Sequence, residues 1–108
     1  MSEILCAEPV TIAASGIIYN GPCIFRGFLL GTDGVNDPTI TIYNNIAASG
    51  EEVIPTCTYD ATALGLNGAT GIMQYCEKGL YAAISVAGGG ACELVPQYSP
   101  FPVTRRAG

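Results

Sequence analysis

The chain has 108 residues, of which 49% are apolar and 12% charged, and its nine acidic and four basic side chains give a net charge of −5. This apolar fraction excludes an intrinsically disordered chain, and the length allows one domain with a single modest core. The negative charge argues against nucleic acid and membranes as partners, and no window reaches the roughly 20 continuous apolar residues of a membrane helix. The scarcity of charge predicts that part of the surface contacts another protein.

Alternation of apolar and polar residues predicts short β-strands along most of the chain. In residues 39–43, Ile40 and Ile42 fall on one side of an extended chain and the threonines and the tyrosine on the other. Residues 80–86 repeat the pattern, with apolar side chains at every second position. In chain order, the predicted strands are 10–13, 16–19, 23–30, 39–43, 53–58, 72–76, 80–86 and 91–98.

The predicted strand at 23–30 alternates less regularly than the others. Phe25 and Phe28 fall on opposite sides of a regular strand. We therefore expect this strand to be covered on both faces. Gly27 in its middle predicts a bulge or a close approach of another backbone.

Turn residues separate these strands. Asn20-Gly21, Asp33-Gly34 and Asn67-Gly68 are dipeptides that accept positive φ, and they predict tight hairpin turns. Gly88-Gly89-Gly90 predicts a further hairpin loop, and residues 61–66 allow at most one turn of helix.

Many short strands joined by short turns predict an all-β fold, a compact antiparallel β-sandwich of jelly-roll-like form with seven or eight strands. The sandwich domain is expected over residues 16–98. Residues 1–15 are expected to form an N-terminal arm with a possible first strand. Residues 99–108, with Pro100 and Pro102, are expected to form an extended C-terminal arm.

Catalytic chemistry is poorly supported by the residue types. The chain has no histidine, which removes the commonest general base and metal ligand. Asp33, Asn36 and Asp37 offer oxygen atoms to a cation, but they lack the EF-hand spacing and are expected to serve as turn residues. We predict no enzyme activity, no cofactor and no metal site.

The cysteines are expected to be reduced and mostly buried. Their number is odd and no CxxC spacing occurs, so a disulfide framework is not indicated, and free cysteine packs as a small hydrophobic residue. The five are Cys6, Cys23, Cys57, Cys76 and Cys92.

Taken as an ordered set, several segments resemble small virion proteins of tailed bacteriophages. In many of those proteins a TxTxYD segment and an xSGxxI segment form one hairpin, and a GLYxxxxG segment begins another. The resemblance covers residues 16–98, with Asn44 where the family often has aspartate. The matching segments are the strand from Gly21 to Gly31, TITIYNN (39–45), ASG (48–50), VIP (53–55), KGLY (78–81) and a closing strand that ends at Tyr98.

The resemblance implies a non-enzymatic decoration or cement protein on the capsid surface of a virion, made and assembled in the host cytoplasm. It implies two partners, namely further copies of the chain, frequently in a trimer, and the major capsid protein. The alternative is a receptor- or carbohydrate-binding module of a phage tail or head fibre, in which tyrosines stack on sugars.

Aromatic and basic residues are the candidates for the oligomer or capsid interface. For the tyrosines, the competing interpretation is a place at the edge of the core. For the tail, the competing interpretation is a frayed terminus. The candidates are Tyr43, Tyr81, Tyr98, Phe101, Arg105 and Arg106.

Overall fold

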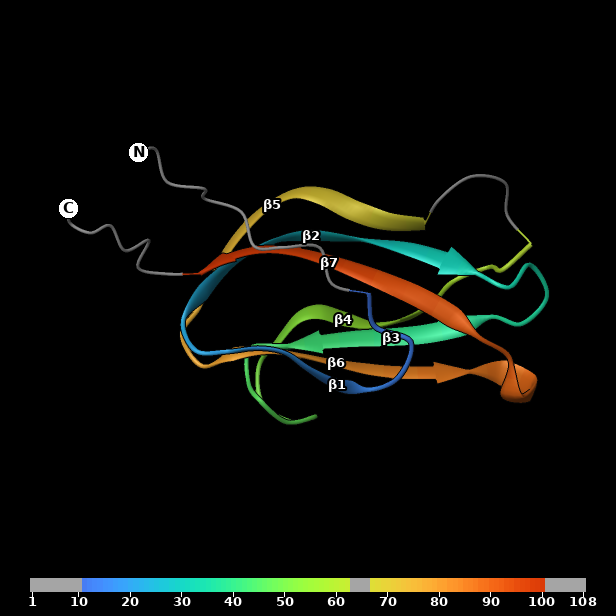
Figure 1. The fold of residues 1–108 in the computed structure, drawn as a ribbon, viewed down its shortest axis with the longest axis horizontal. Helices are drawn as coiled ribbons and strands as arrows, with labels where there is room; N and C mark the ends of the chain where they lie inside the picture. The colour runs from blue at the N-terminus through green and yellow to red at the C-terminus, as the bar shows by residue number, and fades with distance from the viewer. Residues whose placement is uncertain (1–10, 63–66, 101–108) are drawn as a thin grey trace.

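Seven β-strands make up most of the residues that the computed structural model describes, which are 11–62 and 67–100 (Figure 1). They form two antiparallel sheets, in the orders β1-β6-β3-β4 and β5-β2-β7. The predicted all-β sandwich is therefore confirmed. The elements are β1 (Gly16–Asn20), β2 (Cys23–Thr32), β3 (Pro38–Tyr43), β4 (Glu52–Thr58), β5 (Asn67–Cys76), β6 (Gly79–Val86), the 3-10 turn η1 (Ala87–Gly89) and β7 (Cys92–Pro100).

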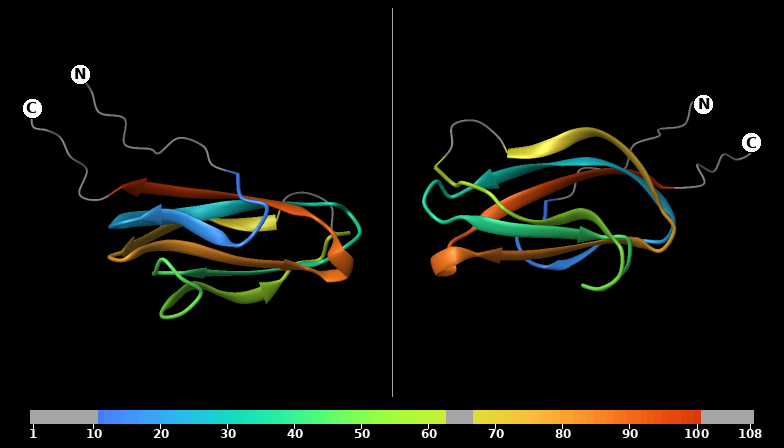
Figure 2. Two further views of the ribbon diagram at one scale, coloured as in Figure 1. Left: turned by 60° about the horizontal axis from the view of Figure 1, so that its bottom comes forward. Right: turned by 180° about the vertical axis from the view of Figure 1, so that it is seen from behind.

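The apolar core lies between the two sheets, which the side views show as two layers (Figure 2). Strand β3 follows its predicted alternation, because Ile40 and Ile42 are fully buried and belong to this core. Removing each large side chain of this kind from water contributes about 1.5–3 kcal/mol. The largest fully buried apolar side chains are Phe25, Phe28, Leu30, Ile40, Ile42, Leu80 and Leu94.

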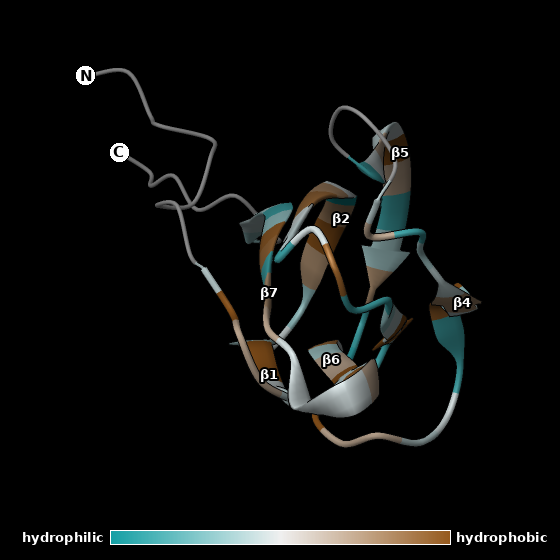
Figure 3. Cartoon of the chain, turned by 90° about the vertical axis from the view of Figure 1, so that its right-hand side faces the viewer, coloured by the Kyte–Doolittle hydropathy of each residue, from teal (hydrophilic) through white to brown (hydrophobic). Residues whose placement is uncertain are grey.

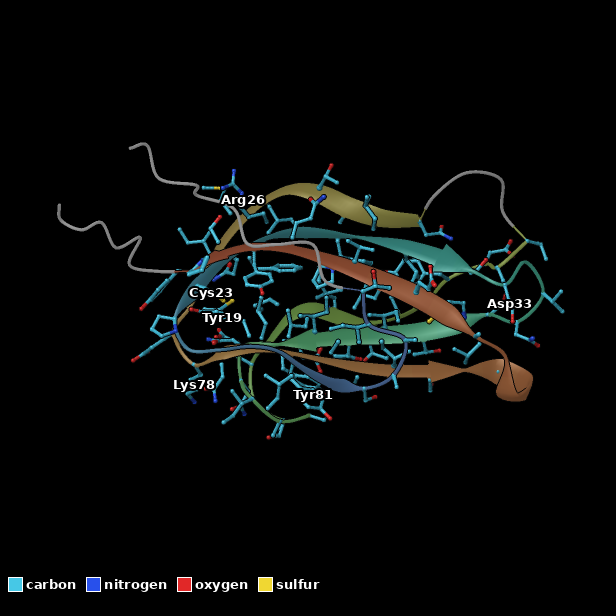
Figure 4. All side chains as sticks on the ribbon, viewed as in Figure 1. Tyr19, Cys23, Arg26, Asp33, Lys78 and Tyr81 are labelled. Atoms are coloured by element: carbon cyan, nitrogen blue, oxygen red, sulfur yellow. The ribbon has the colours of Figure 1, made fainter. Side chains whose placement is uncertain are left out.

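Strand β2 changes the phase of its alternation at a bulge. Its register with both β5 and β7 shifts between Phe25 and Gly27. Phe25 before the bulge and Phe28 after it are both fully buried in the core, whereas Arg26 is exposed and points away from it (Figure 4). The predicted bulge is confirmed. The expectation of a strand covered on both faces is wrong, because the bulge brings both phenylalanines to one face.

Gly27 also meets the predicted requirement for a close approach. A Cβ atom at this position would collide with the backbone carbonyl oxygen of Ala69 in β5. Its φ of +128° is a value that L side chains rarely adopt. The residue is therefore required to be glycine for two independent reasons.

None of the predicted hairpin turns joins two paired strands, and one of them is not a turn. Asn20-Gly21 joins β1 to β2, and Asp33-Gly34 lies between β2 and β3, so both cross from one sheet to the other. Asn67-Gly68 lies inside β5, and Gly88-Gly90 belongs to the crossing from β6 to β7. Among successive strands, only β3 and β4 are neighbours in one sheet. A turn between two strands does not by itself determine whether those strands pair with each other.

The ends of the domain differ from the predicted boundaries. Strand β7 continues to Pro100, two residues beyond the predicted domain end. Of the predicted strand at 10–13, the described part forms a single bridge in which Ile12 and Leu94 exchange two backbone hydrogen bonds of 2.8 Å. Residues 1–10 and 101–108 lie outside the described residues, as do positions 63–66 of the predicted helical turn.

Replacing Gly27 with alanine should lower the free energy of unfolding by about 1–3 kcal/mol, because β2 and β5 must separate at the bulge. Gly31→Ala in the same strand is the matched control, since its φ is ordinary and the nearest atom to the added Cβ is the Glu93 carbonyl oxygen at 4.0 Å. Urea unfolding followed by circular dichroism measures both. Equal losses would contradict the role assigned to the bulge.

Candidate functional site

The outer face of the four-stranded sheet carries a row of large side chains in cross-strand register. Ile17 in β1 lies opposite Tyr81 in β6, and Tyr81 lies opposite Tyr43 in β3. Their neighbours Ile42 and Ala82 point into the core, so these three side chains point away from it. Figure 4 shows Tyr81 on the side of β6 that faces away from the other sheet. We call the outer surface of β1, β6 and β3 around this row the tyrosine face.

Small and hydroxyl side chains complete this surface. Thr41 lies opposite Ala83 in β6, and its side chain is only 5% exposed. Its hydroxyl lies 2.7 Å from that of Thr56 in β4, and the hydroxyls of Thr39 and Thr58 are 2.8 Å apart. These two contacts tie β3 to an edge strand whose backbone register is irregular. Small and hydroxyl side chains therefore surround the three large side chains of the row on the outer surface of this sheet.

Charge is nearly absent from the four strands of the sheet that carries this surface. Within β1, β3, β4 and β6, Glu52 at the start of β4 is the one charged residue. It lies opposite Tyr43, at the end of the row. Another protein surface could therefore cover the centre of the face without burying an ionised group, which is the composition found at the centre of protein interfaces.

Tyr98 lies elsewhere, in the three-stranded sheet. Its ring packs at the edge of the core against Tyr19, with the ring centroids 5.2 Å apart. Burial raises the pKa of the Tyr98 phenol. The structure thus brings Tyr43 and Tyr81 together and leaves Tyr98 apart from them, in the position of a core-edge tyrosine. Phe101, Arg105 and Arg106 lie outside the described residues.

The sequence analysis missed Ile17, whose side chain is 49% exposed. Ile17 and Ile18 are adjacent in the chain, and a shift in the register of β1 with β6 falls between Ile17 and Tyr19. Ile18 is buried in the core while Ile17 points outward. The pair of consecutive isoleucines was the available signal, because a strand with one buried face can bury only one of them.

The aspartates predicted to serve as turn residues join loops at one end of the sandwich, the end that faces the viewer in Figure 3. One carboxylate oxygen of Asp33 accepts hydrogen bonds from the backbone N–H groups of Val35 and Asn36, at 2.8 and 2.7 Å. The other accepts from the Asn36 amide at 3.0 Å and from the backbone N–H of Ala91 at 3.1 Å. Asp33 therefore links the β2–β3 crossing to the residues that precede β7.

These donors hold the pKa of the Asp33 carboxyl far below its ordinary value, with the hydrogen bonds from Asn36 making the largest contribution. Asp37 has a similar structural contact, because its carboxylate accepts the backbone N–H of Ala61 at 2.9 Å. Among the described residues, no group of three or more histidine, cysteine, aspartate or glutamate side chains could hold a metal ion.

The four cysteines that the structure describes are free thiols. Three of them, Cys23, Cys76 and Cys92, are buried, as expected for most of the set. Cys57 is exposed, because it lies in the edge strand β4 next to a shift in register with β3. Cys6 lies outside the described residues.

Comparisons with protein-family models, with curated proteins and with solved structures found no match for this chain. Residues 11–62 and 67–100 contain no helix with the length and apolar character required to span a membrane.

Protonation of Asp33 should destabilise the fold in acid. Its carboxyl is more acidic in the folded chain than in the unfolded one, where the pKa is about 3.9. Its contribution is thus complete above that value and is lost as the pH falls below it. We expect Asp33→Asn to lower the melting temperature at pH 7 and to flatten its decline between pH 5 and pH 2.

Asp60→Asn is the comparison for this experiment, because the Asp60 carboxylate bonds only to Thr62 within the described residues and joins no second loop. It should lower the melting temperature at pH 7 by less than Asp33→Asn does. A loss as large as that of Asp33→Asn would contradict the linking role of Asp33.

Proposed function

We propose that this chain is a non-enzymatic structural protein of a tailed-phage virion, a decoration or cement protein that binds the capsid surface as a homo-oligomer. The observation that carries the proposal is the tyrosine face, with Ile17, Tyr81 and Tyr43 in register across three strands. The proposal that the particle is a tailed-phage virion rests on the ordered segments that resemble small phage virion proteins.

The large outward side chains of this face are not part of the core, which leaves them free for a contact role. The core is formed by the inward side chains of both sheets, and Tyr43 and Tyr81 are not part of it. Tyr43 and Tyr81 are half-buried, so part of each outward side chain still contacts solvent on a nearly uncharged sheet, and tyrosine is enriched at the centres of protein interfaces. A neighbouring subunit or the capsid would bury this remaining apolar surface.

The acidic residues support a non-enzymatic role. Three of the aspartates accept hydrogen bonds from backbone N–H groups, so their carboxylate oxygens stabilise loops. They are Asp33, Asp37 and Asp60. Glu52 is the one charged residue within the strands of the four-stranded sheet. A pair of carboxylates for acid and base catalysis would need to converge on a shared substrate position.

Tyr81→Arg should disrupt self-association by placing a cation at the middle of the row. We expect the parent protein to elute as an oligomer, with a trimer favoured by the resemblance, and the variant to approach the chain mass of 11.1 kDa. Its association should weaken by at least about 30-fold. Light scattering on a sizing column measures this, and circular dichroism verifies the fold.

Gln97→Arg is the matched control, because Gln97 is an exposed residue of β7 on the three-stranded sheet. It adds the same charge far from the tyrosine face and should associate as the parent does. A monomeric parent protein would contradict the oligomer, and a Tyr81→Arg variant that associates normally would contradict the face.

Deleting residues 101–108 tests the predicted role of Phe101, Arg105 and Arg106 in attachment. The described sandwich ends at Pro100, so the melting temperature should change little. The loss of two cations from a chain of net charge −5 should weaken binding to an acidic capsid surface. Co-sedimentation with undecorated capsids measures the attachment, and unchanged binding would show that the tail is dispensable.

A glycan array probed with the full chain distinguishes the capsid decoration protein from the alternative, a receptor- or carbohydrate-binding module. Specific glycan binding without co-sedimentation on capsids would favour the receptor- or carbohydrate-binding module. Capsid binding without glycan binding is the result that the proposal predicts.

A further inference from the structure

Two buried cysteines lie directly opposite each other on neighbouring strands. Cys23 is the first residue of β2 and Cys76 is the last residue of β5, and they are register partners in the antiparallel pair. Both side chains are 0% exposed. The other described cysteines have no such partner, because Cys57 lies opposite Ile40 and Cys92 lies opposite Thr32.

This placement satisfies the reach of a disulfide. Directly opposed residues of an antiparallel pair have Cα atoms about 4.5–5.5 Å apart, and a disulfide joins Cα atoms that are roughly 4.4–6.8 Å apart. Both side chains belong to the core and therefore point to the same side of the three-stranded sheet. The backbone of the sandwich can thus hold the two thiols at a distance that one S–S bond spans.

The two thiols also differ in acidity because of each other. The hydrogen bond from the Cys23 thiol lowers the pKa of Cys76, and the same interaction, together with burial, raises the pKa of Cys23. The Cys76 sulfur lies 3.7 Å from the Gln74 carbonyl oxygen. The thiolate is the form that attacks a disulfide, and the lowered pKa of Cys76 favours it as the attacking thiol.

The Cys76 side chain is 0% exposed, so an oxidant reaches it only through a local opening of the chain. Within the described residues, β5 is an edge strand that pairs only with β2. Cys76 is its terminal residue and is followed by the exposed residues Glu77 and Lys78. Opening of the end of an edge strand requires less free energy than global unfolding.

We propose that Cys23 and Cys76 are a redox-active pair that forms a reversible disulfide with a small-molecule disulfide as the oxidant. With oxidised glutathione, the Cys76 thiolate attacks one sulfur, forms a mixed disulfide and releases one glutathione. The Cys23 thiolate then attacks the Cys76 sulfur and releases the second glutathione. Two cysteine thiols are oxidised to one disulfide, one glutathione disulfide is reduced to two thiols, and the cysteine protons pass to the released thiolates.

The bond would tie the edge strand β5 to the central strand β2. The loop that it closes contains β3 and β4, so it restricts the unfolded chain over about half of its length. Oxidised protein should therefore melt roughly 10 °C or more above the reduced protein. Dithiothreitol should reverse the shift.

The test begins with the fully reduced full-length chain, incubated with excess oxidised glutathione and compared with an untreated sample. Thiol titration in denaturant should show the loss of two of the five thiols, and the intact mass should fall by two hydrogen atoms. Tandem mass spectrometry of the tryptic digest should find the link between Cys23 and Cys76. Cys6→Ser and Cys57→Ser should both retain this oxidation, whereas Cys23→Ser should lose it.

Three results would overturn the proposal. One is the persistence of all five thiols, even after refolding in the glutathione buffer. Another is a disulfide that maps to Cys6, Cys57 or Cys92, or that links two chains. The third is stable glutathione attached to Cys76 in the parent protein with Cys23 still reduced. Because mapping is done on the parent protein, the test does not depend on the folding of Cys23→Ser.

Discussion

The bulge at Gly27 is the constraint on which the rest of the sandwich depends. Strand β2 is the middle strand of the three-stranded sheet, and its register with both neighbours shifts at this point. Without the shift, Phe25 and Phe28 would point to opposite faces and one of them would leave the core. With the shift, both phenylalanines point into the core. Strand β5 also approaches so closely at position 27 that only glycine fits there.

A core filled in this way leaves the outer surface of the other sheet available for contacts. The same alternation that buries Ile40 and Ile42 presents Tyr43 outward, and β6 does the same for Tyr81. Asp33 at the β2–β3 crossing is engaged by backbone amides, and β1, β3 and β6 contain no charged residue. The alternation of inward and outward side chains along β3 and β6 thus produces both the core and the candidate interface.

The sequence predicted what depends on local periodicity and failed where pairing is long-range. Strands β3 and β6 were predicted because their alternation is unbroken, and the placement of Ile40 on the inner side followed from it. The turns at Asn20-Gly21 and Asp33-Gly34 were located correctly and the one at Asn67-Gly68 was not, because these two residues begin β5; a turn also does not specify which sheet receives the next strand. The row of Ile17, Tyr81 and Tyr43 and the opposition of Cys23 to Cys76 both depend on register between distant strands, and no local pattern encodes it.

Hydroxyl-radical footprinting tests the central claim, that the tyrosine face is the surface by which this chain binds its partners. The chain is labelled alone at low concentration and again when bound to undecorated capsids, and the modified side chains are identified by mass spectrometry. Our account predicts that Ile17, Tyr43 and Tyr81 become protected on binding, while the exposed Met73 of β5 stays reactive. Protection of Met73 with unchanged labelling of Tyr43 and Tyr81 would contradict it.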